Sequence, residues 1–166
     1  MYSRIKGTGS YLPEKVLTNK DLEKMVDTTE AWITERTGIK ERHIAADGQT
    51  TCDLAEQAAL AAMDAAGVTA DDIDLIIVAT TTPDRVFPST ACLLQQRLGI
   101  HGCAAFDVQA VCTGFVYAPG IADKVIKRGS NKGRPVSGAE TMPRSTDRAE
   151  RGSRHPVGCW TGGGSS

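Results

Sequence analysis

The sequence contains few aromatic residues, few histidines and no long apolar run. Aromatic residues make up 5% of its 166 positions, and three histidines occur. No apolar run approaches the roughly 20 residues of a membrane-spanning helix, so we expect no membrane association. The formal net charge is −1, without a basic cluster, which argues against a nucleic-acid partner. The N-terminus has no apolar core typical of a signal peptide, so we expect a cytoplasmic protein.

The sequence also lacks paired cysteine motifs. Its five cysteines show neither C-x-x-C pairing nor zinc-finger spacing. An odd number of cysteines without an export signal indicates reduced thiols, and we expect neither a disulfide framework nor a metal site. Each is interpreted as a core residue unless its surroundings argue otherwise. The cysteines are Cys52, Cys92, Cys103, Cys112 and Cys159.

Regular patterns fill the first two-thirds of the chain. Helices are predicted over residues 18–26, 27–38, 50–67 and 89–99. A continuous run of β-branched residues at 73–80 predicts a strand buried on both faces, and 103–111 predicts the next strand. Strands that alternate with helices through short links predict a layered α/β fold with parallel strand pairs.

Local signals mark the helix ends and one buried face. N-caps are expected at Asp27 (with Glu30 three residues later), at Thr50 or Thr51, and at Ser89, with stops at Gly38, Gly67 and Gly99. The long helix carries a small-residue stripe that suits close packing on a sheet. The stripe consists of Leu54, Ala58, Ala61, Ala62 and Ala65.

Cys112 lies where the second predicted strand meets an apolar segment of helical spacing. A helix N-terminus favours the thiolate, which is the reactive form of cysteine. The small Thr113-Gly114 pair permits a sharp turn, and we expect its N–H groups to be free to hold an oxyanion. From these residues alone, a buried structural cysteine is the alternative.

No histidine stands in a context that marks a catalytic base. His43 follows a loop and is interpreted as a surface or hydrogen-bonded structural residue, and His101 is expected to be exposed. His155 lies in the irregular C-terminal region. A different thiol enzyme that uses one of these histidines is the weakest of the alternatives.

The regular patterns fail after residue 118. Pro119 falls inside a helical pattern, where it removes the hydrogen bond to the Phe115 carbonyl at a cost of about 3 kcal/mol. Pro135 and Ser137 interrupt a segment in the position of a buried strand. Residues 152–166 show no apolar periodicity, so we expect an aberrant or disordered tail there. A reading-frame error is one hypothesis for its origin.

Four sequence blocks, in this order and at natural spacing, resemble one family. They are GTGSYLPEKVLTN, EAWITERTGIKERHIA, IDLIIVATTTPDRVFPSTA and FDVQAVCTGFVYA. Together they resemble the N-terminal half of β-ketoacyl-acyl carrier protein synthase III, a thiolase-like condensing enzyme. The resemblance is close over residues 1–118 and looser to about 151. It implies that residues 1–151 form an incomplete thiolase-like half, a mixed sheet with flanking helices, usually in a homodimer.

The resemblance also implies a reaction. Members of this family condense acetyl-CoA with malonyl-acyl carrier protein to acetoacetyl-acyl carrier protein, the first condensation of fatty acid synthesis. Cys112 would accept the acetyl group; acetyl-CoA is a substrate, and neither a cofactor nor a metal is implied. The family's catalytic histidine and asparagine lie in the other half and have no counterpart here. We therefore expect Cys112 at most to accept an acyl group, without condensation. The alternative is a catalytically inert fragment that acts as a dimerisation or interaction module.

Further site residues follow from the resemblance. Trp32 and Arg151 match the positions that sandwich the adenine of CoA, which suits an aromatic face and a guanidinium plane. Thr28 and Arg36 match other CoA-site positions, with the charge of Arg36 near phosphate. Phe87 matches a residue that lines the acyl pocket across the dimer interface. Without the resemblance, Trp32 would be read as a packing residue and Arg36 as a solvated charge at a helix end.

Overall fold

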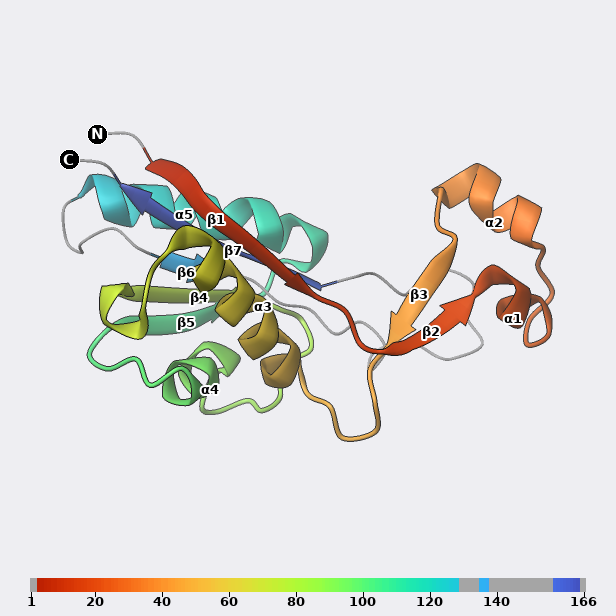
Figure 1. Ribbon diagram of the computed structural model, residues 1–166, viewed down its shortest axis with the longest axis horizontal. Coiled ribbons are helices and arrows are strands. Elements are labelled where there is room, and N and C mark those ends of the chain that lie inside the picture. The colour runs from red at the N-terminus through yellow and green to blue at the C-terminus, as the bar shows by residue number, and fades with distance from the viewer. Residues whose placement is uncertain (1–2, 129–134, 138–156, 165–166) are drawn as a thin grey trace.

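A five-stranded mixed sheet forms the centre of the molecule (Figure 1). The computed structural model describes residues 3–128, 135–137 and 157–164. The strand order is β1-β7-β6-β4-β5. The strands are β1 (Ser3–Tyr11), β4 (Leu75–Ala79), β5 (Ala104–Val108), β6 (Pro135–Ser137) and β7 (Val157–Gly164). β4 pairs in parallel with β5 and β6, whereas β7 is antiparallel to β1 and β6. The predicted parallel pairing is confirmed.

Helices cover both faces of this sheet. α3 (Thr51–Ala66) and α4 (Thr90–Arg97) lie on one face, and α5 (Gly114–Lys127) lies on the other (Figure 1). The side chains of β4 alternate between the two layers. Ile76 and Val78 join the cluster under α3 and α4, whereas Leu75 and Ile77 pack with alanines of α5. All four are at most 2% exposed, so the prediction of a strand buried on both faces is confirmed.

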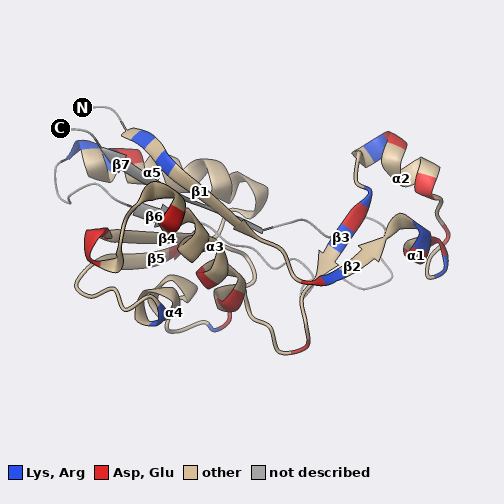
Figure 2. Cartoon of the chain, viewed as in Figure 1, with Lys and Arg blue, Asp and Glu red and all other residues tan. Residues whose placement is uncertain are grey.

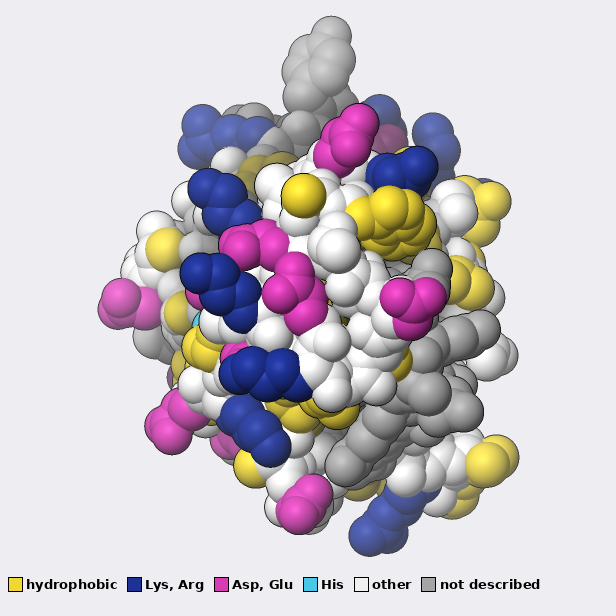
Figure 3. Space-filling model, turned by 90° about the vertical axis from the view of Figure 1, so that its right-hand side faces the viewer, with side chains coloured by type: hydrophobic (Ala, Val, Ile, Leu, Met, Phe, Trp, Pro, Cys, Tyr) yellow, Lys and Arg dark blue, Asp and Glu magenta, His cyan; other side chains and the backbone are white. Residues whose placement is uncertain are grey.

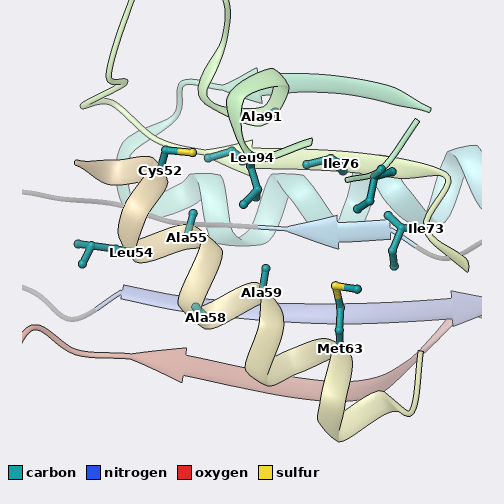
Figure 4. Packing of buried hydrophobic residues seen from close by; sticks show 12 residues of the cluster. Cys52, Leu54, Ala55, Ala58, Ala59, Met63, Ile73, Ile76, Ala91 and Leu94 are labelled. Atoms are coloured by element: carbon teal, nitrogen blue, oxygen red, sulfur yellow. The ribbon is translucent and has the colours of Figure 1, made fainter. Parts of the chain in front are cut away.

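α3 approaches its neighbours closely because its buried side chains are small. Figure 4 shows Cys52, Ala55, Ala59 and Met63 of α3 facing Ile76 and Leu94. This row was not predicted. Of the predicted stripe, Leu54, Ala58 and Ala62 are buried, whereas Ala61 and Ala65 are exposed.

β1 lies against α3, and two glycines make this approach possible. A Cβ atom at Gly9 would lie 2.2 Å from the Ala62 amide nitrogen and 2.4 Å from the Ala58 carbonyl oxygen. At Gly7, a Cβ would lie 2.5 Å from the Ala66 amide nitrogen. Backbone atoms cannot yield at these distances, so only glycine fits. β1 was not predicted, and the reason for its alternating glycines is visible only where the strand meets α3.

Residues 15–44 form a smaller unit, here called the helical extension, that projects from the layered body (Figure 1). Its elements are β2 (Lys15–Thr18), α1 (Asn19–Glu23), α2 (Glu30–Thr37) and β3 (Glu41–Ile44). β2 and β3 pair as an antiparallel ribbon. The helices were predicted and the short strands were not. Figure 2 shows charges of both signs along α1, α2 and β3.

The helix ends follow the predicted caps with one exception. The Thr50 and Ser89 side chains cap α3 and α4, and Gly38, Gly67 and Gly99 have positive φ angles of 71°, 63° and 66° at the predicted stops. The cap predicted at Asp27 is wrong. Thr29 caps α2 instead, because its side-chain oxygen accepts the Trp32 N–H at 3.1 Å.

The predicted disruption at Pro119 is also wrong. α5 continues through Pro119 to Lys127, and its residues Ala118, Ala122 and Ile126 are buried. Packing of this apolar face therefore holds the helix despite the missing N–H. Pro135 is the first residue of β6, a strand position that tolerates proline.

The C-terminal region differs from its predicted lack of structure. Residues 157–164 form β7, although the sequence there shows no apolar periodicity. The expectation that residues 152–166 form a separate tail after a domain at 1–151 stays a prediction. Within the described residues, no helix is both long and apolar enough to cross a bilayer.

Candidate functional site

Cys112 occupies the turn that joins β5 to α5. The turn is a short 3-10 helix, η2 (Val111–Thr113), and Cys112 is exposed within it. Because β5 runs parallel to β4 and β6, this turn lies beyond the carboxyl edge of these strands, where α/β sheets commonly bind ligands. Val111 has a φ of 48°, which is strained for a β-branched residue. The predicted strand-to-helix presentation of the thiol therefore agrees with the structure.

The start of α5 lies close against the end of β4. A Cβ atom at Gly114 would lie 2.9 Å from the Ala79 Cβ. The expectation of free N–H groups is wrong, however. The Thr113 N–H donates to the Ala110 carbonyl at 3.1 Å, and the Gly114 N–H donates to the Val111 carbonyl. The 3-10 turn thus satisfies both donors internally, and they are not available for an oxyanion.

Asp107 on β5 fixes the start of α4. Its carboxylate accepts the N–H groups of Thr90 at 2.9 Å and Ala91 at 2.8 Å. These donors lack partners inside the helix, and the helix dipole favours a negative charge there. The strand that leads to Cys112 is therefore tied through Asp107 to the opposite helix layer. The sequence signal was a lone acidic residue within an apolar strand.

Asp84 does the same for α3. Its carboxylate accepts the N–H groups of Thr51 at 2.8 Å and Cys52 at 3.1 Å. Asp84 belongs to the connection between β4 and α4, which also carries Phe87. The Phe87 side chain is 87% exposed in this chain. The connection is thus anchored at Asp84 while it presents an aromatic side chain outward.

A second group of predicted residues gathers on α2. The Arg36 guanidinium lies 4.6 Å from the centre of the Trp32 ring, and these residues are one helical turn apart. Trp32 is 37% exposed. The Thr28 hydroxyl oxygen is buried without a hydrogen-bond partner among the described residues. A partly exposed cation–aromatic stack suits a ligand with an aromatic ring. Arg151 lies outside the described residues.

Charges of both signs are interspersed over the face of the molecule on which the helical extension lies (Figure 3). The view shows no large field of one sign. A ligand phosphate at this face would therefore be recognised by individual side chains such as Arg36 rather than by a broad positive surface.

Two buried polar residues of the helical extension were missed. Asn19 is 1% exposed and Arg42 is 7% exposed, and an Arg42 Nη1–H donates to the Asn19 Oδ1 at 2.7 Å. Both stand in the sequence blocks that carry the resemblance. Their pairing was not visible because the two residues are 23 positions apart. An asparagine directly after the cap residue Thr18 was the only local signal, and it does not reveal burial.

The other thiols are less accessible than Cys112. Cys52 is fully buried, and this burial raises its pKa to about 11. Burial likewise raises the pKa of Cys103, although a hydrogen bond from Gln95 opposes the shift. Cys92 is half-buried, and its thiol donates to the Ala105 carbonyl at 3.6 Å. Among these four cysteines, Cys112 is the one that solvent reaches most freely.

The described histidines give Cys112 no base. The His43 Nδ1 lies 2.6 Å from the Pro13 carbonyl oxygen, which confirms a hydrogen-bonded structural role. His101 is exposed, as predicted, and His155 lies outside the described residues. In the described part of the chain, no group of three or more histidine, cysteine and acidic side chains is arranged to hold a metal ion.

Comparison with known proteins finds similarity to one family of enzymes. The family model of 3-oxoacyl-[acyl-carrier-protein] synthase III, another name for the β-ketoacyl enzyme, matches residues 106–158, which include Cys112. The β-ketoacyl-[acyl-carrier-protein] synthase III of Thioalkalivibrio sulfidiphilus is 69% identical over 90% of this chain and 47% of its own length. The enzyme of that name from Xanthomonas campestris is 66% identical over 91% of this chain and 46% of its own length.

Over about nine-tenths of its own length, the chain is similar to β-ketoacyl-acyl carrier protein synthase III enzymes. Solved structures of this family have the same fold. The synthase from Aquifex aeolicus gives a TM-score of 0.91 at 46% identity and covers 98% of this chain and 54% of its own. The synthase from Pseudomonas aeruginosa gives a TM-score of 0.89 at 36% identity, and the match covers 100% of this chain and 53% of that synthase. The predicted thiolase-like fold is confirmed, and the chain spans about half the length of the curated relatives it matches.

Proposed function

We propose that this chain is the acyl-accepting part of a β-ketoacyl-acyl carrier protein synthase III, with Cys112 as its nucleophile. The exposed thiol at the strand-to-helix turn, inside the segment that the family model matches, carries the proposal. The Cys112 thiolate attacks the thioester carbonyl carbon of acetyl-CoA. A new sulfur–carbon bond forms, the bond to the CoA sulfur breaks, and CoA leaves as its thiolate.

Binding of acetyl-CoA is assigned to α2 and the residues around it. Trp32 offers a partly exposed ring, Arg36 a fixed positive charge and Thr28 an unused hydroxyl. Arg151 is proposed as the second face of the adenine site and Phe87 as a wall of the acyl pocket of a partner subunit. Malonyl-acyl carrier protein and a second copy of the chain are the other proposed partners. The chemistry requires no metal or cofactor, and a reduced Cys112 suits the cytoplasm.

Condensation is not assigned to this chain. The resemblance places the histidine and asparagine of the family, which stabilise the enolate and the oxyanion of condensation, outside it. Removal of one oxyanion donor commonly costs about 10² to 10³ in rate. The proposed step is therefore transfer of an acetyl group to Cys112.

Exposed apolar side chains favour a second candidate function, that of an inert interaction module. Large side chains around the Cys112 turn and on the connection after β4 are more than half exposed. They are Val86, Phe87, Val111, Phe115, Val116 and Tyr117. Several large apolar side chains exposed in this way are typical of contact sites between proteins.

Labelled acetyl-CoA distinguishes the two functions. The purified chain is incubated with [1-¹⁴C]acetyl-CoA, and then malonyl-acyl carrier protein is added. We expect label on the Cys112 peptide, none on the Cys52 peptide, and no acetoacetyl product. Cys52 is an internal control because it is buried and its pKa is raised to about 11.

The variant Cys112→Ser should lose the label. An unlabelled wild-type chain with native circular dichroism would leave the interaction module as the better account. Formation of acetoacetyl-acyl carrier protein by the chain alone would contradict the restriction to acyl transfer.

A further inference from the structure

We propose that the buried pair of Asn19 and Arg42 is a positioning device that sets the orientation of α2 and thereby of the Trp32–Arg36 stack. The identity of the ligand at this stack rests on the proposed function, whereas the orientation itself does not. The hydrogen bonds of the Asn19 amide go to Thr34, Ile39 and Arg42, and not to the two side chains of the stack. Asn19 and Arg42 are therefore positioning residues, and their effect on a ligand is transmitted through α2.

Asn19 joins three parts of the extension through its side-chain amide and its main-chain N–H. Its Nδ2 donates to the Ile39 carbonyl at 2.7 Å and to the Thr34 hydroxyl at 3.3 Å. Its Oδ1 accepts from Arg42, and its main-chain N–H donates to the Lys40 carbonyl at 3.2 Å. An asparagine amide has two N–H donors and one oxygen acceptor, so each group has a partner. Buried side-chain hydrogen bonds of this kind favour one arrangement of the elements that they join.

The attachment acts on the side of α2 opposite the stack. Successive residues of an α-helix are about 100° apart, so residues four apart share a face and residues two apart do not. Trp32 and Arg36 are four residues apart, and Thr34 lies midway between them. The burial agrees, because Trp32 and Arg36 are exposed while Thr34 is half-buried. Asn19 therefore contacts α2 on the side opposite to Trp32 and Arg36.

Arg42 connects this attachment to the ribbon. It lies on β3, where it is the register partner of Leu17 on β2. Asn19 is the first residue of α1, directly after β2. The pair therefore joins the ribbon, the start of α1 and the end of α2 in one place. A shift of α2 relative to the ribbon would break these hydrogen bonds and turn the stack.

The variant Asn19→Asp separates this role from general stability. Aspartate keeps an oxygen that accepts from Arg42, and its negative charge strengthens that bond. It replaces the Nδ2 donor by a carboxylate oxygen that repels the Ile39 carbonyl. The variant thus keeps the attachment to β3 and loses the N–H bond to the Ile39 carbonyl just after α2, whereas the Thr34 hydroxyl can still donate to the new carboxylate. Lys24→Ala is the matched control, because it removes an exposed ion pair with Asp21 in the same extension.

The first readout needs no ligand. In NMR spectra of the full chain, the side-chain protons of Arg36 should be shifted upfield by the Trp32 ring, since the guanidinium lies over that ring. We expect Asn19→Asp to lose most of this ring-current shift with unchanged far-ultraviolet circular dichroism. Lys24→Ala should retain the shift. An Arg36 shift that is unchanged in a folded Asn19→Asp variant would overturn the proposal.

The second readout is the affinity for adenosine 3′,5′-bisphosphate, measured by calorimetry as a probe for the nucleotide end of CoA. We expect roughly tenfold to hundredfold weaker binding in Asn19→Asp. If the wild-type chain does not bind the probe, the proposed CoA site fails, while the ring-current shift still decides the positioning role.

A second variant decides the case if Asn19→Asp does not fold. Thr34→Val keeps the shape of the side chain and removes one acceptor of the Asn19 amide. A smaller loss of the Arg36 shift supports the proposal, and an unchanged shift overturns it.

Discussion

Single glycines decide how closely β1 can lie against α3. Gly9→Ala would place a Cβ at 2.2 Å from the Ala62 nitrogen, so β1 or α3 must move. We expect a loss of about 1–3 kcal/mol in the free energy of unfolding, as is typical of overpacking. Urea unfolding followed by circular dichroism measures it.

Gly120→Ala is the matched control for this prediction. Gly120 lies in α5 with open space around the position of a Cβ. Alanine at this position should raise the free energy of unfolding by about 0.5–1 kcal/mol, because glycine is unfavourable within a helix. Equal effects of the two substitutions would contradict the assigned contact between β1 and α3.

At the scale of elements, α5 retains an unfavourable residue in its interior. Pro119 provides no N–H for the Phe115 carbonyl, yet the apolar face of the helix packs on the sheet. We expect Pro119→Ala to raise the free energy of unfolding by about 3 kcal/mol. Equilibrium unfolding in urea checks this. A neutral result would mean that the helix in solution is already broken at this residue.

The elements that could be predicted from the sequence are those whose signals are local. α3 has its cap, its apolar stripe and its terminal glycine within one segment, and the structure agrees at both ends. β1 could not be recognised in this way, because its partner β7 lies at the other end of the sequence. The stop expected at Pro119 failed for the same reason. Local propensity argued against the helix, and packing against a strand distant in sequence outweighs it.

The same distinction between local signals and long-range contacts applies to the candidate site. The turn at Cys112 could be predicted because a strand, a small-residue pair and an apolar segment follow one another directly. The role of Asp107 and the pairing of Asn19 with Arg42 depend on contacts between separate elements. The occupied N–H groups of Thr113 and Gly114 depend on the backbone geometry of η2, which side-chain types do not specify.

For the molecule as a whole, the exposed apolar side chains near Cys112 predict association in solution. β1 and β5 are also the edges of the sheet, where unpaired backbone groups favour contact with another chain. We expect sedimentation velocity to show a sedimentation coefficient that rises with protein concentration. The double variant Phe87→Ser, Val116→Ser should reduce this rise, because both side chains are more than half exposed.

Leu60→Ser is the control for association. Leu60 is exposed on α3, on the other side of the sheet from α5. The Leu60→Ser substitution should leave the concentration dependence of the sedimentation coefficient unchanged. A monomer at every concentration tested would contradict the prediction.

Asp107 has a mechanical consequence for the reactive thiol. Its side chain holds the first turn of α4, and its backbone begins the short run that ends at Cys112. The helix that follows the thiol, α5, packs on the opposite face of the sheet. The backbone that carries Cys112 is thus attached to α4 on one face of the sheet and continues into α5 on the other face. A shift of either helix relative to the sheet would therefore displace the thiol.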